Sequence, residues 1–248
     1  MRLSCIALLS LSVIALVACS ATMDASGPSG VSRGLLLELQ AVDADRVTTT
    51  NVLDRRAQRF ELRDGDCMRF LDRGNTRDCE TSRERVEFSS RERDGLGETA
   101  CYGLSILLPR DFAEMDVKST FMQLHDVGYG DAVSIRYLQG RMWLNQTLGN
   151  TDIRSQTLDY RTGEWNDFFF RVTPGHSADG SIELWLNGDK VLSDIGSQTI
   201  VSDMTEWYFK YGIYRSGLDR SRFTKHPTQV VYFSKVSRVE GSECENVR

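Results

Sequence analysis

Apolar and polar residues alternate along most of the chain after residue 84. In a β-strand successive side chains point to opposite faces, so alternation with a period of two predicts strands that bury one face. Such segments, rich in β-branched and aromatic residues and bounded by Gly, Asn, Asp or Pro, are residues 85–90, 100–109, 117–126, 132–138, 141–147, 165–174, 181–188, 207–215 and 228–240. The pattern predicts an all-β protein.

Two short segments have the spacing of helices instead, GLLLELQAV at 34–42 and PRDFAEM at 109–115. Residues 173–192 contain two turns that flank a hairpin strand. No internal repeat and no second composition regime divides the chain. We therefore expect one domain, residues 34–248, folded as an antiparallel β-sandwich of the jelly-roll, concanavalin A-like type. A polar row on the outer, concave face of one sheet would be free to line a groove.

The N-terminal residues have the features of an export signal. Arg2 precedes an apolar run that ends in LVAC and is too short for a convincing membrane-spanning helix. This order is typical of a signal peptide, residues 1–18, with a bacterial lipobox that leaves Cys19 as a lipidated first residue; ordinary cleavage at a small residue is the alternative. Residues 19–33, rich in small polar residues, fit a flexible tether. Ser20, in place of an Asp, favours the outer membrane of a Gram-negative bacterium, with periplasmic and surface display both open.

Export changes how the remaining cysteines are interpreted, because an oxidising compartment favours disulfides over free thiols. Four cysteines follow Cys19, and they allow three pairings. We favour Cys67 with Cys79, which closes a local loop, and Cys101 with Cys244, which ties the C-terminal tail to a strand. A zinc site is disfavoured, since no C-x-x-C pair and no histidine at ligand spacing is present.

The charge balance argues against a nucleic-acid partner. The formal charge is −5 at pH 7, and loss of residues 1–18 removes only Arg2, which changes it to −6. Residues 54–93 contain eleven arginines, but ten acids accompany them. Nucleic-acid binding needs a basic surface, so a smaller anionic ligand that meets a few focused cations is the better expectation.

Three predicted strands carry polar residues on one face, opposite apolar ones. They are Arg83, Arg85 and Glu87; Gln123 and His125; and Tyr208, Lys210 and Tyr214. Gly212, on the last strand, leaves room for something to approach the backbone. Each residue alone has a structural explanation, and a salt network is the favoured one for Glu87. Their joint presence favours a site.

These side chains are the set that β-elimination from a uronic acid requires. Arginine and glutamine can bind and neutralise a carboxylate, which acidifies the hydrogen on the neighbouring carbon. Histidine can take that proton near neutral pH. Tyrosine can protonate the departing oxygen, or act as a base where cations such as Lys210 and Arg85 lower its pKa.

The segments RVEF at 85–88, QLH at 123–125 and YFKYGIY at 208–214 resemble three motifs of jelly-roll polysaccharide lyases. In alginate lyases these motifs have the patterns R-S-E-L, Q-I-H and Y-F-K-A-G-x-Y, and glucuronan lyases and heparin-lyase-like enzymes form related groups. The segments occur in the family's order and span about half the chain. The hairpin GSIELWLNGDKV and the closing VVYFSKVSRVE also resemble that superfamily.

The resemblance implies a role for each matching residue. Arg85 and Gln123 would hold the substrate carboxylate, His125 would serve as base or charge neutraliser, and Tyr214 would be the acid and a second candidate base. Further candidates for substrate contacts are Lys210, Arg83, Tyr208, Trp143 and Arg215. The chain departs from the alginate-lyase motif at Tyr211, where that motif has Ala, and at Arg215-Ser216, where it commonly has Asn-Gln. These departures favour the glucuronan and heparin-lyase-like branch and leave the substrate open.

We therefore expect a monomeric lyase that cuts alginate, glucuronan or, less favoured, a heparin-type polymer and leaves a C4–C5 double bond. The scheme requires no cofactor or catalytic metal, and a structural calcium stays open. A glycoside hydrolase needs two carboxylates, and only Glu114 and Asp116 come near that pattern. A lectin-like carbohydrate-binding lipoprotein could use the same face without chemistry, and a purely structural envelope lipoprotein is a third alternative. Tyr214 together with His125 favours the enzyme, since binding alone needs no acid and base.

Overall fold

The computed structural model describes residues 32–69, 77–126 and 128–246. The expected signal peptide, Cys19 and the tether as far as residue 31 fall outside these ranges. Ser32 and Arg33, expected in the tether, form the first short strand of the fold. Across the three described ranges, no helix has the length and apolar character needed to cross a membrane.

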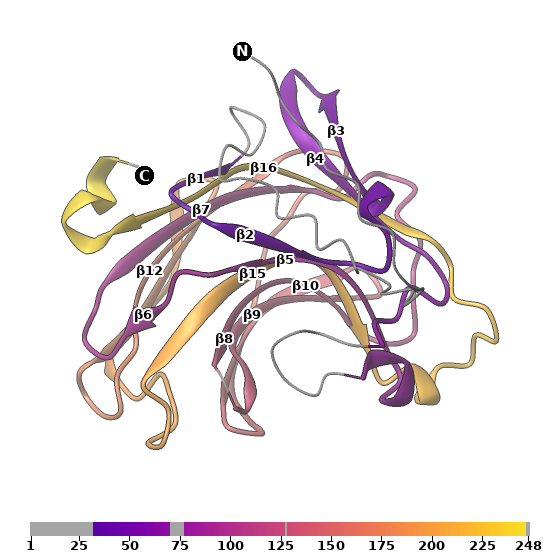
Figure 1. The fold of residues 1–248 in the computed structure, drawn as a ribbon. Helices are drawn as coiled ribbons and strands as arrows, with labels where there is room; N and C mark the ends of the chain where they lie inside the picture. The colour runs from indigo at the N-terminus through magenta and orange to yellow at the C-terminus, as the bar shows by residue number, and fades with distance from the viewer. Residues whose placement is uncertain (1–31, 70–76, 127, 247–248) are drawn as a thin grey trace, which may run out of the picture.

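Two β-sheets stack face to face and form a sandwich (Figure 1). The first sheet has the order β14 (Asp189–Ser197), β13 (Gly180–Leu186), β12 (Asn166–Thr173), β7 (Ala100–Leu107), β16 (Gln229–Glu240), β4 (Arg55–Leu62) and β3 (Val47–Val52), with β1 (Ser32–Arg33) beside β16. The second has the order β11 (Thr151–Thr157), β10 (Arg141–Leu148), β9 (Gly130–Leu138), β8 (Ser119–Asp126), β15 (Glu206–Ser216), β5 (Arg83–Ser90) and β2 (Leu37–Gln40), with β6 (Asp94–Gly95) beside β15. The 3-10 helices are η1 (Ala44–Arg46), η2 (Asp78–Glu80), η3 (Leu218–Arg220) and η4 (Gly241–Asn246).

The hydrophobic core lies between the sheets. Tyr102 of β7 stacks on Phe209 of β15 with ring centroids 4.7 Å apart, and Phe60 of β4 meets Tyr211 of β15 edge-on at 5.6 Å. Because side chains alternate along each strand, the residues between these core positions face outward. The second sheet curves, and its outward face is the concave one (Figure 1).

The nine strands predicted from alternation are present, and each boundary lies within two residues of the expected position. The predicted hairpin is also confirmed: Asn187 and Gly188, with φ of 53° and 93°, connect β13 to β14. The alternation did not reveal β4, which lies inside the first sheet between β16 and β3. It also did not reveal β3, β11 and part of β14, which run along sheet edges and are largely exposed. Edge strands bury little, so their sequences lack the apolar alternation that reveals central strands.

The two predicted helices are wrong, because the described residues contain only strands and 3-10 turns. Residues 37–40 form β2, where Leu37 and Leu39 pack against the core while Glu38 and Gln40 alternate with them. In residues 109–115 a single turn is closed by the Phe112 amide, which donates to Pro109. Segments this short form helices only when packing supports them, and here packing supports a strand and a loop.

Both favoured disulfides are confirmed. Cys67 bonds to Cys79 and closes the loop between β4 and β5. Cys101 of β7 bonds to Cys244 of η4 and holds the C-terminal segment against the first sheet.

Candidate active site

The three sequence motifs lie on the adjacent strands β5, β15 and β8, in that order across the second sheet. Register brings their polar residues together: Tyr208 pairs with His125, Lys210 with Gln123, and Tyr214 with Arg85. We call the outward-facing set the polar row, which consists of Arg83, Arg85, Glu87, Gln123, His125, Tyr208, Lys210 and Tyr214. The sheet thus assembles one polar surface from segments far apart in the sequence.

Glu87 lies at the centre of the polar row. Its Oε2 accepts a hydrogen bond from Lys210 Nζ at 2.6 Å, and its Oε1 accepts one from Gln123 Nε2 at 2.5 Å. All three side chains are buried. Burial lowers the pKa of Lys210, and the Glu87 carboxylate opposes that shift. Lys210, expected to bind substrate, is therefore engaged by Glu87, as the salt network favoured for Glu87 predicts.

Arg85 is held by a carboxylate from outside the three motifs. Its Nε and Nη2 donate to the two oxygens of Asp78 at 2.6 and 2.7 Å, while its Nη1 lies 3.4 Å from Glu87. Asp78, on η2, is fully buried. Burial lowers the pKa of Arg85, but the bonds and charges of Asp78 and Glu87 outweigh it and raise that pKa, so the guanidinium stays cationic.

His125 presents an unprotonated nitrogen. Its Nδ1 lies 2.6 Å from the carbonyl oxygen of Asp126, which can only accept, so Nδ1 carries the proton and Nε2 has the lone pair. No hydrogen bond to Nε2 occurs within the described ranges. Burial, together with the charge of Lys210, lowers the pKa of His125 to about 3. The imidazole is therefore neutral at pH 7.

Both tyrosines of the row remain protonated. Burial raises the pKa of Tyr214 and outweighs the opposing charges of Arg83 and Arg85, so the net direction is opposite to the one expected from the cations alone. Burial also raises the pKa of Tyr208. The Arg85 guanidinium lies 4.9 Å from the Tyr214 ring, and His125 lies 5.1 Å from the Tyr208 ring. Both phenols can therefore donate a proton.

Arg83 and Trp143 are the more accessible candidates. Arg83 is half-buried beside Tyr214 and, within the described part of the chain, forms no ion pair. Trp143, on β10, is half-buried, pairs with Arg136 of β9 on the outward face, and has the Arg141 guanidinium 5.5 Å from its ring. A cation and an indole are thus available at separate positions on this face.

Arg215 is placed differently from the expectation. It is fully buried on the inward face of β15, where its Nη2 pairs with Glu84 Oε2 at 2.5 Å and its Nη1 donates to the Pro227 carbonyl at 2.7 Å. The alternation that sends Tyr214 outward sends Arg215 inward, so the signal was present in the sequence. We give Arg215 no role in substrate binding.

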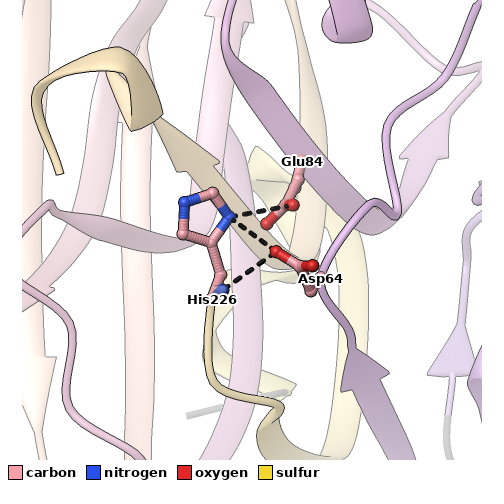
Figure 2. Close-up of side chains that lie close together, drawn as sticks. All are labelled: Asp64, Glu84 and His226. Atoms are coloured by element: carbon pink, nitrogen blue, oxygen red, sulfur yellow. Dashed lines mark hydrogen bonds and ion pairs between the residues drawn. The ribbon is translucent and has the colours of Figure 1, made fainter. Parts of the chain in front are cut away.

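One cluster in the described residues has the donor atoms to hold a metal ion: Asp64, Glu84 and His226 (Figure 2). His226 Nδ1 lies 3.2 Å from Asp64 Oδ1 and 3.1 Å from Glu84 Oε1. Arg215 already pairs with Glu84, and Glu84 is on the inward side of β5. The cluster, His226 included, therefore lies apart from the polar row.

Sequence reasoning missed several residues that complete the outward face. Asp78 and Arg93 come from segments between strands, and the Arg93 guanidinium lies 4.2 Å from the Tyr208 ring. Arg136 donates to Ser134 at 3.0 Å and pairs with Asp131 at 2.8 Å. Alternation along 132–138 could have found Arg136, whereas no local pattern indicated Asp78 or Arg93.

Comparison with known proteins identifies a family that the chain matches. Residues 24–237 match the model of a family described as polysaccharide lyase. A search of curated proteins gave no match.

Solved structures share the fold. An endo-β-1,4-glucuronan lyase from the fungus Trichoderma reesei is 14% identical, with a TM-score of 0.62 over 84% of this chain and 93% of that one. A marine family 7 alginate lyase from Zobellia galactanivorans is 17% identical, with a TM-score of 0.55 over 80% and 82%. An alginate lyase from Corynebacterium sp. is 16% identical, with a TM-score of 0.56 over 80% and 82%.

Proposed function

Because the chain belongs to the polysaccharide lyase family, we propose that it cleaves an anionic uronic-acid polymer by β-elimination on the polar row. The observation that carries the proposal is the protonation pattern of this face. A neutral histidine with a free Nε2 and protonated tyrosines lie on the same surface as a permanently charged arginine. That combination supplies a base, an acid and a carboxylate-neutralising cation at pH 7.

The proposed reaction begins with neutralisation of the uronate carboxylate. Arg85 and Gln123 bind the carboxylate, and Arg83 adds a cation that has no ion-pair partner among the described residues. Each can offer an N–H beyond those already engaged, because a guanidinium has five and an amide two. A neutralised carboxylate accepts the electron pair left when the C5 hydrogen departs, and this lowers the barrier to carbanion formation.

His125 and Tyr214 then carry the two proton transfers. His125 Nε2 takes the C5 proton, and the electron pair forms the C4–C5 double bond as the C4–O bond breaks. The Tyr214 phenol gives its proton to the departing glycosidic oxygen. Water is not consumed, and the proton balance is restored when His125 returns its proton to Tyr214 through solvent. The scheme routes no step through a metal.

Alginate and glucuronan are the proposed substrates, and a heparin-type polymer is less favoured. The three solved structures described above are glucuronan and alginate lyases by their descriptions, although identities of 14–17% support the fold rather than the substrate. Tyr211 favours the glucuronan and heparin-lyase-like branch over alginate, because it replaces the alanine of the alginate-lyase motif. It does so from the core side, where its hydroxyl donates to Gln58 at 2.7 Å.

We also propose that the enzyme is exported and anchored through Cys19. The signal-like residues 1–18 and the two disulfides support this, because disulfides persist in oxidising compartments such as the bacterial envelope.

The test is ultraviolet absorbance of the new conjugated double bond while purified protein acts on polymannuronate, polyguluronate, glucuronan and heparin in turn. We expect absorbance to rise with one polymer and to be lost, by about 100-fold or more, in Tyr214→Phe. Tyr208→Phe is the matched control, since Tyr208 rather than Tyr214 contacts the His125 ring. A greater loss in Tyr208→Phe would move the acid to Tyr208. Flat traces with all four polymers, together with measurable binding, would reject the proposed reaction and favour a carbohydrate-binding role.

A further inference from the structure

We infer that Asp78 is a positioning residue for Arg85 and that the Cys67–Cys79 disulfide holds Asp78 in place, so that this bridge sets the activity of the polar row. The inference rests on the proposed function, in which Arg85 binds the substrate carboxylate. It concerns the loop between β4 and β5, which belongs to none of the three motifs.

The geometry of the Asp78–Arg85 pair fixes the plane of the guanidinium. Two parallel bonds of 2.6 and 2.7 Å join the Asp78 oxygens to Nε and Nη2. Asp78 is 0% exposed and Arg85 is 6% exposed. A bidentate carboxylate sets both the position and the orientation of an arginine, and in a buried site the bonds are charge-assisted. The plane so fixed lies over the Tyr214 ring at 4.9 Å.

Without Asp78, Arg85 has another carboxylate within reach. Glu87 Oε2 is 3.4 Å from Arg85 Nη1 and already accepts from Lys210. A buried guanidinium that loses its partner turns toward the nearest remaining negative charge, because an unpaired buried charge is costly. Arg85 would then draw toward Glu87 and away from Tyr214, where the proposed substrate carboxylate must lie.

The disulfide is coupled to Asp78 through the chain itself. Cys79 directly follows Asp78, and its partner Cys67 directly follows Asp66. The Asp78 amide donates to the Met68 carbonyl at 2.9 Å, and the Arg85 amide donates to the Asp66 carbonyl at 3.0 Å. The bridge therefore joins the segment that carries the positioning carboxylate to the segment that is bonded to the backbone of Arg85 on β5. After reduction, the contacts that hold Asp78 within the described residues would be backbone hydrogen bonds and the Asp78–Arg85 pair itself.

The same loop contains a matched control. Asp66 is 3% exposed and binds Arg46 through two bonds of 2.8 and 3.0 Å, so it forms a bidentate pair of the same kind, although Arg46 is only half-buried. Arg46 belongs to η1 and, within the described residues, pairs only with Asp66 and Asp45. Asp66→Asn should therefore destabilise the loop as Asp78→Asn does, without releasing Arg85.

The first experiment compares kcat and KM of the wild type, Asp78→Asn and Asp66→Asn on the polymer that the wild type cleaves, at a temperature where circular dichroism shows all three folded. We expect Asp78→Asn to lower kcat/KM by about 100-fold, mostly in kcat, because a displaced cation stabilises the carbanion less. Asp66→Asn should stay within about threefold of the wild type. Equal losses in the two variants would overturn the inference, since only loop stability would then be at work.

The second experiment compares the two disulfides. Cys67→Ser/Cys79→Ser should lower kcat by about tenfold or more, and dithiothreitol should have the same effect on the wild type. Cys101→Ser/Cys244→Ser should keep the wild-type kcat, because that bridge holds η4 against β7, away from the polar row. Full activity in Cys67→Ser/Cys79→Ser would exclude a role for the bridge. A wild type that forms no unsaturated product would instead refute the proposed function. An active wild type with an equally active Asp78→Asn would refute only the inference about Asp78.

Discussion

At the scale of single residues, burial sets the protonation of both proposed proton-transfer groups. It lowers the pKa of His125 to about 3, which keeps the imidazole neutral, and it raises the pKa of Tyr214, which keeps the phenol protonated. Desolvation disfavours the charged form in each case, so the base and the acid are in their reactive states without help from substrate. The enzyme should be active over a wide range of pH.

The pH dependence of kcat/KM tests this directly. A histidine of ordinary pKa, about 6.5, would lose its basic form below that value and give an acid limb there. With a folded pKa of about 3, His125 keeps its lone pair far below neutrality, so kcat/KM should stay level from about pH 8 down to about pH 5. The measurement is kcat/KM across this range at constant ionic strength. His176→Gln and His226→Gln remove the other two histidines of the chain in turn. The prediction fails if kcat/KM still falls with an acid limb centred between about pH 6 and 7 in both variants.

Sequence reasoning at this scale found the motif residues but not their partners. Period-two alternation places Arg85, His125 and Tyr214 on outward faces, because it depends only on strand geometry. Asp78 reaches Arg85 from a loop, and no local pattern reports a contact between a loop and a strand. Arg215 shows the opposite case: alternation places it on the core side, where it is fully buried, although it was expected to contact substrate.

At the scale of elements, β15 has a β-bulge where the sheet carries the polar row. Tyr211 pairs with Met122 and Tyr214 pairs with Thr120, so two residues of β15 face one of β8. Gly212 lies in this bulge with φ of 142°. A Cβ there would lie 2.2 Å from the Val86 carbonyl oxygen of β5. The neighbouring strand, rather than a ligand, fills the space that the sequence analysis attributed to Gly212.

Replacement of Gly212 tests how far β15 depends on this bulge. Gly212→Ala introduces both an unfavourable φ and a clash with backbone, so we expect a loss of about 2–4 kcal/mol in the free energy of unfolding. Gly130→Ala is the control, because Gly130 has φ of 124° but nothing within 4 Å of an added Cβ. It should lose only about 1–2 kcal/mol. Urea denaturation gives both values, and a Gly212→Ala protein no less stable than Gly130→Ala would contradict the structure.

The elements themselves were predictable to different degrees. Central strands such as β7, β8 and β16 bury one face completely, and their alternation gave boundaries within two residues. The segment at β2 was misassigned because LLLELQ fits either period over so few residues. Only its pairing with β5 decides for a strand, and pairing between distant segments is absent from local sequence.

At the scale of the whole molecule, the two disulfides differ in what they constrain. Cys67–Cys79 spans 12 residues, and Cys101–Cys244 spans 143. The sequence predicted both pairings because one closes an obvious local loop and only one pair then remains. It could not show that the short loop supplies the partner of Arg85.

Stability should rank the disulfides by the length of chain each one closes. Removal of Cys101–Cys244 as the double serine variant should lower the free energy of unfolding by about 3–5 kcal/mol, and removal of Cys67–Cys79 by about 2–3 kcal/mol. This order is the reverse of the one expected for activity, where removal of Cys67–Cys79 has the larger effect. Urea denaturation of the two variants at equal pH gives the comparison, and a larger loss for the short loop would show that it is stabilised by more than chain entropy.

The balance of charge in the polar row affects how the protein meets a polyanion in solution. Lys210 and Arg85 each have an internal carboxylate partner, and the chain as a whole carries a formal charge of −5. The net negative charge therefore repels a uronate polymer at long range, and the cations of the polar row attract it only near contact. Salt at about 0.1 M screens charges more than about 10 Å apart, so moderate salt should quicken encounter, whereas it slows polyanion capture by basic proteins. The cleaved fragments are also anionic, so they should dissociate readily from the protein.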